Sequence, residues 1–74
     1  MLVAGIIIGV CTNVETGVTL LHVESFDSEE VYEFRVRAAP GKIRCGDIYE
    51  LRESVAYLHP KRGKSEIPLK VIRT

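Results

Sequence analysis

The chain has 74 residues, enough for one domain spanning residues 1–74 and too few for a second core. Its apolar fraction of 46% excludes a disordered chain. The formal net charge is zero, but the first 34 residues carry −6 and the last 40 carry +6. Such an asymmetry between halves indicates contact with nucleic acid or another acidic surface.

Three apolar runs at the start of the chain predict three antiparallel β-strands. Residues 2–10 are rich in β-branched side chains and fall short of the roughly 20 residues needed to cross a membrane. Residues 18–23 form the second run. Residues 31–37 alternate apolar and charged side chains, the period-2 pattern of a half-buried strand. No secretory signal is visible, so the expected location is the cytoplasm, without a membrane partner.

Two glycines interrupt the first run. Gly5 and Gly9 enclose three isoleucines and lack the spacing of a dinucleotide-binding fingerprint. We expect them to relieve crowding in a tightly coiled strand.

The segment between residues 43 and 59 admits two interpretations. As a helix over 47–58, it begins with Asp47 as N-cap and Glu50 three residues later. As strands, residues 43–51 and 55–59 are joined by a polar turn. The β character of the surrounding chain favours strands, and the helix remains the alternative, which would make the fold α+β.

The tail predicts a hairpin. Residues 55–59 and 67–72 flank a polar loop that contains glycine. Together these elements predict an all-β domain, a small five-stranded antiparallel barrel. Its strand order is similar to that of an OB-fold, and an SH3-like barrel suits the same pattern.

The tail hairpin also supplies the strongest candidate site. Its tip carries three cations, and the strand leading to it places two rings on one face, where they are able to stack on unpaired bases. Two arginines on one face of the third strand either extend this basic surface or pair with acids on neighbouring strands. The candidate nucleic-acid-binding residues are Lys61, Arg62, Lys64, Tyr57, His59, Arg35 and Arg37. We therefore expect a nucleic-acid-binding module that prefers single strands.

Metal binding and catalysis find little support. Two cysteines and two histidines, Cys11, His22, Cys45 and His59, are spaced too irregularly for a zinc site. Both cysteines are expected to be free and buried. No phosphate loop or nucleophile motif is present, so we expect no enzyme, no metal, no cofactor and no small-molecule substrate.

A homo-oligomeric interaction or scaffold module is the alternative function. The apolar run over residues 3–10 exceeds what one small core covers, so its surplus face would pack against a second subunit in a dimer or higher oligomer. Acidic and basic faces would complement each other between the copies. This hypothesis is compatible with nucleic-acid binding.

Overall fold

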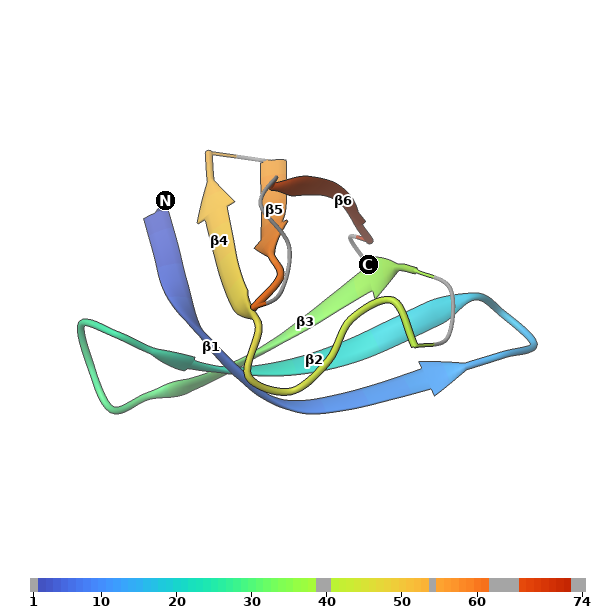
Figure 1. Cartoon of the computed structure of the whole chain (residues 1–74), viewed down its shortest axis with the longest axis horizontal. Coiled ribbons are helices and arrows are strands. Elements are labelled where there is room, and N and C mark those ends of the chain that lie inside the picture. The colour runs from blue at the N-terminus through green and yellow to red at the C-terminus, as the bar shows by residue number, and fades with distance from the viewer. Residues whose placement is uncertain (1, 39–40, 54, 62–65, 73–74) are drawn as a thin grey trace.

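The structure is a computed structural model that describes residues 2–38, 41–53, 55–61 and 66–72. These residues form an all-β protein with six strands (Figure 1). The strands are β1 (Leu2–Asn13), β2 (Val18–Ser25), β3 (Val31–Arg37), β4 (Ile48–Arg52), β5 (Val55–His59) and β6 (Ile67–Val71). The expected count of five is therefore wrong by one.

The helix considered over residues 47–58 is also wrong, because the described part of this segment is β4 and β5. Side chains alternate along β4: Tyr49 is buried, while Ile48 is exposed on the opposite face. Glu53 then adopts a φ of 57°, a left-handed conformation that ends the strand in a turn. No helix among the described residues is long and apolar enough to cross a membrane.

All strand pairs are antiparallel and follow the order β1-β2-β3-β6-β5-β4. The pairing of β4 with β1 closes the ring of hydrogen bonds. Strand β1 makes this possible because it is long: its first half pairs with β4, and it pairs with β2 from Gly5 to Asn13. A shift in register between Ile7 and Gly9 marks a bulge at the bend of β1.

Gly5 lies where β1 passes closest to the backbone of β2. A Cβ atom there would lie 2.8 Å from the carbonyl carbon of Glu24 and 2.8 Å from Cγ1 of Val23, and closer still to the Glu24 carbonyl oxygen. This confirms that the glycine relieves crowding. At Gly9 the nearest atoms to a Cβ would belong to the side chain of His22, with Nδ1 at 3.1 Å and Cβ at 3.4 Å.

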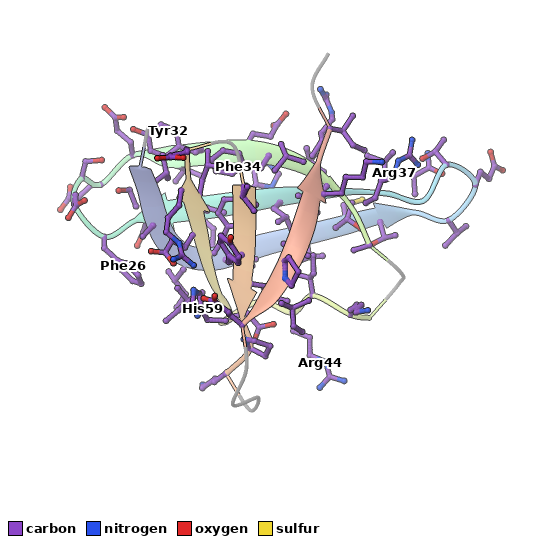
Figure 2. The ribbon with its side chains drawn as sticks, turned by 90° about the horizontal axis from the view of Figure 1, so that it is seen from above. Phe26, Tyr32, Phe34, Arg37, Arg44 and His59 are labelled. Carbon is purple, nitrogen blue, oxygen red and sulfur yellow. The ribbon has the colours of Figure 1, made fainter. Side chains whose placement is uncertain are left out.

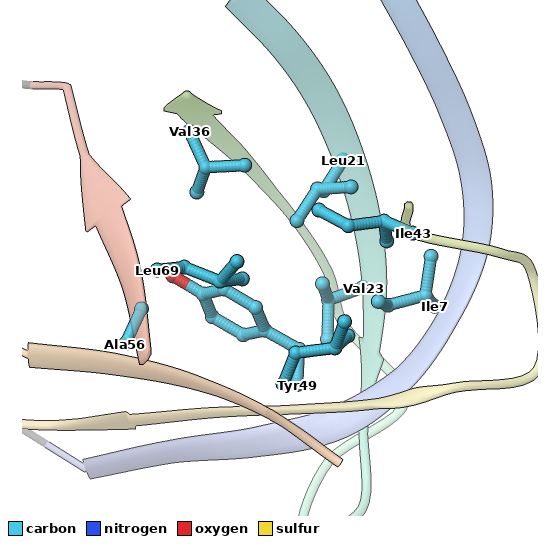
Figure 3. Packing of buried hydrophobic residues seen from close by; sticks show 9 residues of the cluster. Ile7, Leu21, Val23, Val36, Ile43, Tyr49, Ala56 and Leu69 are labelled. Carbon is cyan, nitrogen blue, oxygen red and sulfur yellow. The ribbon is translucent and has the colours of Figure 1, made fainter. Parts of the chain in front are cut away.

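The core fills the inside of the ring (Figure 3). Every strand contributes to it, and one further residue, Ile43, comes from the β3–β4 connection. The ring of Tyr49 stacks on that of Phe34 with a centroid distance of 4.6 Å. The buried cluster consists of Ile7, Leu21, Val23, Val36, Ile43, Tyr49, Ala56, Leu58 and Leu69.

Tyr49 is fully buried, and its hydroxyl has no hydrogen-bond partner among the described residues. Burial raises the pKa of this phenol from 10.0 to about 12. Between these pH values the unfolded chain loses the proton that the folded protein retains, so the free energy of unfolding falls as pH rises. Below pH 10 this effect is absent.

We expect Tyr49→Phe to flatten this alkaline loss of stability in urea denaturation between about pH 9 and pH 12. At neutral pH, removing an unpaired hydroxyl should raise the free energy of unfolding by up to about 1 kcal/mol. Tyr32→Phe is the comparison: the hydroxyl of the half-buried Tyr32 donates to Glu30, which also raises the pKa of Tyr32, so this variant should lessen the alkaline loss too, but it gives up a hydrogen bond and should show no gain in stability at neutral pH. An equal alkaline slope in Tyr49→Phe and the unmodified protein would contradict the expectation.

Candidate nucleic-acid interface

Asp47 joins the two loops that form the candidate site. It is 6% exposed and stands just before β4. The backbone N–H of Arg44 donates to its Oδ2 at 3.1 Å, and the backbone N–H of Lys61 donates to its Oδ1 at 3.0 Å. One carboxylate therefore holds the β3–β4 connection against the chain that leaves β5.

This connection is also tied to β1. The N–H of Ile7 donates to the carbonyl oxygen of Asp47 at 2.9 Å, and the N–H of Gly46 donates to the carbonyl oxygen of Ile7 at 2.8 Å. Gly46 has a φ of 97°, which a glycine adopts without strain. The loop is thus anchored to the sheet at the point where β1 bends.

A pocket of about 410 Å³ opens between these loops. It is lined by Gly41, Lys42, Arg44, Cys45, Asp47, Pro60 and Lys61. Three of these side chains are cationic, against a single carboxylate that already accepts two backbone N–H groups. Such a concave, positively charged surface suits a phosphate group.

The three cations of the pocket, Lys42, Arg44 and Lys61, are exposed. Among the described residues, none of the ion pairs within 4.0 Å includes them. The acidic β2–β3 turn projects at the left end of the molecule in Figure 1, away from this pocket. Figure 2 shows the same separation between Phe26, which begins that turn, and Arg44.

Of the hairpin cations expected to bind nucleic acid, Lys61 lies in the pocket. Arg62 and Lys64 lie outside the described residues. The two rings expected to stack on bases, Tyr57 and His59, are half-buried on the outer face of β5.

Both rings already have partners. The guanidinium carbon of Arg52 lies 4.1 Å from the centroid of the Tyr57 ring, a cation–π contact. Nε2 of His59 lies 3.1 Å from Oε1 of Glu50 and 3.9 Å from Oε2 of Glu66.

The donor atoms of Glu50, His59 and Glu66 lie within 4.8 Å of one another, as they would around a metal ion. However, Nε of Arg52 lies 3.2 Å from Glu50, and a terminal nitrogen of the same guanidinium lies 3.0 Å from Glu66. A cation between the carboxylates would have to displace that guanidinium. We therefore describe this group as an ion-pair network.

Arg35 and Arg37 are exposed on the outer face of β3. Arg35 lies 4.0 Å from Glu33, and a terminal nitrogen of Arg37 donates to the carbonyl oxygen of Thr16 at 3.2 Å. Arg37 is paired in register with Lys70 of β6. These cations are separate from the pocket residues.

Comparison with protein-family models, with curated proteins and with solved structures finds no match to the chain.

Lys42 and Arg44 were not among the predicted site residues. Their signal in the sequence was the basic character of the last 40 residues, but nothing local connects them with Lys61. The expected burial of both cysteines is wrong: Cys11 and Cys45 are free but exposed. Cys11 lies on the outer face of β1 opposite Leu20, whereas Cys45 lines the pocket.

Proposed function

We propose that this protein is a non-catalytic nucleic-acid-binding module whose basic pocket takes a backbone phosphate. The observation that carries the proposal is the convergence of Lys42, Arg44 and Lys61 on one pocket, with no described ion-pair partner. Cations in this state are accompanied by mobile counterions rather than by protein carboxylates. Phosphate binding releases the counterions of the nucleic acid, which favours association at low salt.

Single strands are the expected ligands. A flexible single strand bends to place a phosphate in a concave pocket, whereas the phosphates of a duplex follow a stiff cylinder. The contact of Arg52 with Tyr57 reduces the free surface of that ring for base stacking. Most of the affinity for a single strand therefore comes from phosphate contacts, and binding depends little on base sequence.

We also infer that the closed ring of strands is a small β-barrel of the OB-like or SH3-like kind, acting in the cytoplasm. The three-strand meander β1–β2–β3 and the pairing of β1 with both β2 and β4 support this inference. In such barrels the connecting loops commonly carry the ligand site, and the pocket residues lie in two connecting loops, β3–β4 and β5–β6.

Fluorescence anisotropy with labelled single- and double-stranded oligonucleotides at several salt concentrations tests the proposal. Alanine variants of Lys42, Arg44 and Lys61 should each weaken single-strand binding and reduce the steepness of its salt dependence by about 0.7 per lost phosphate contact. Lys70→Ala, an exposed cation of β6 outside the pocket, is the matched control and should bind as the unmodified protein does. Absence of binding at low salt, or equal losses in the control and pocket variants, would refute the proposal.

The two exposed cysteines provide an internal comparison in one molecule. Cys45 lines the pocket, and Cys11 lies on the outer face of β1. A bound single strand should slow alkylation of Cys45 by iodoacetamide and leave the alkylation rate of Cys11 unchanged, as measured by peptide mass spectrometry. Protection of both thiols or of neither would contradict binding at the pocket.

A further inference from the structure

Four apolar side chains form one patch on the outer surface, here called the β1 patch: Ile6, Ile8, Phe26 and Ile48. Ile8 is 48% exposed, Phe26 60% and Ile48 39%, and Ile6 is half-buried. On the outer face of β3, by contrast, the charged side chains Glu33, Arg35 and Arg37 follow one another. In a monomer the β1 patch would therefore be an apolar surface exposed to water.

Strand register places these residues together. Ile6 of β1 lies directly opposite Ile48 of β4. The N–H of Phe26 donates to the carbonyl oxygen of Ala4 at 3.0 Å, which continues the pairing of β2 with β1 by one residue. Ile8 is the residue at the bulge, where the inward position is taken by the buried Ile7.

Apart from the Glu50–His59–Glu66 network beside Ile48, the two sides of the β1 patch carry charges of opposite sign that are unpaired among the described residues. Glu24 lies opposite Ile6 on β2, and Asp27 follows Phe26; both are exposed and appear in no described ion pair. On the other side, His59 pairs with Ile48, and Lys61 follows two residues later. Figure 2 shows Phe26, His59 and Arg44 in this order along one side of the molecule.

We propose that the β1 patch is the contact between two copies of this chain related by a two-fold axis. The axis lies in the plane of the patch, perpendicular to the line from its acidic to its basic side. Rotation by 180° about this axis places the acidic side of each copy over the basic side of the other. Glu24 then faces Lys61 of the second copy, twice by symmetry, with the isoleucines and Phe26 between these pairs.

A second copy fits this surface better than other occupants do. An anionic membrane would be repelled by Glu24 and Asp27. An unrelated protein partner would have to reproduce the same order of acidic, apolar and basic groups, which this chain already presents to itself. The small apolar area predicts a dimer of moderate affinity that is weakened by salt.

Sedimentation velocity at low salt, from about 1 µM to about 1 mM protein, measures the dimer dissociation constant. Phe26→Ala should raise that constant at least about tenfold, since a truncated apolar anchor loses contact area in the interface. Val14→Ala is the matched control: Val14 is 74% exposed on the β1–β2 turn, outside the β1 patch, and its variant should dimerise unchanged.

Charge reversal tests the orientation of the copies. Glu24→Lys and Lys61→Glu should each weaken the dimer, and the double variant should restore it because the pairs are re-formed with the charges exchanged. A monomer at every concentration, equal effects of the Phe26 and Val14 variants, or no restoration in the double variant would overturn the proposal. Lys61 also lines the basic pocket, so these measurements contain no nucleic acid, and their failure leaves the proposed function untouched.

Discussion

Replacing Gly5 with alanine is expected to lower the free energy of unfolding by about 3 kcal/mol, at the upper end of the costs of overpacking. The added Cβ would lie 2.8 Å from the carbonyl carbon of Glu24, a backbone atom of a paired strand that has no rotamer to change. To relieve this contact, β1 and β2 would have to move apart. That movement breaks hydrogen bonds between β1 and its two neighbours, β2 and β4. Urea denaturation followed by circular dichroism measures the effect.

Gly9→Ala is the matched control in the same strand. The nearest atoms to its Cβ would belong to the half-buried side chain of His22, whose ring is able to turn away. We expect a loss below about 1 kcal/mol. If the two alanine variants were equally stable, the tight approach of β1 and β2 at Gly5 would be refuted. If Gly5→Ala does not fold in buffer alone, the two alanine variants are compared in a stabilising osmolyte, which ranks the two positions in the same way.

Replacing Asp47 with alanine is expected to cost about 2 kcal/mol and to weaken the basic pocket at the same time. The substitution leaves the backbone N–H groups of Arg44 and Lys61 without their acceptor, at about 1 kcal/mol or more each. With the two loops no longer joined, the cations of the pocket lose their common position. Thermal unfolding measures the first effect, and oligonucleotide anisotropy measures the second.

Asp47→Asn separates the two contributions. The amide retains one acceptor oxygen, so only one of the two N–H groups is left unpaired, and the loss of stability should be about half that of alanine. Because asparagine is neutral, the Asp47→Asn variant also removes from the pocket the carboxylate that repels phosphate. An Asn variant as unstable as the alanine variant would show that the carboxylate does more than accept these two hydrogen bonds.

Strands β1 to β3 and the tail of the chain could be predicted because one face of each strand is buried. In β3, Phe34 and Val36 face the core, while Arg35 and Arg37 face water, and this period of two is visible in the residues alone. The tail was predicted in the same way. Both predictions needed only local information.

The segment over residues 43–59 could not be decided locally. Ile48, Leu51 and Val55 satisfy the spacing of a helix as well as that of strands. The pairing of β4 with β1 on one side and with β5 on the other resolves the choice, because both sets of hydrogen bonds involve residues far away in sequence. Ile43, expected to begin a strand, instead enters the core from a connecting loop.

The candidate site, too, could be predicted only in part from the sequence. Its basic composition was visible in the sequence, and Lys61 follows β5 as predicted. The meeting of that loop with Lys42 and Arg44 depends on the carboxylate of Asp47, which local pattern had suggested as a helix cap. A buried carboxylate accepts any suitable N–H within reach, so its partners follow from the path of the whole chain.

The sequence by itself determined that the chain begins with β-strands and has an acidic first half and a basic second half, because alternation and charge are properties of neighbouring residues. Only the tertiary structure decided that six strands close into a ring, which cations share a pocket, and which isoleucines remain on the surface. Closure requires β1 to bend and pair with two strands at once. Such pairings join residues distant in sequence, and their energy depends on the fit of the whole chain rather than on any one segment.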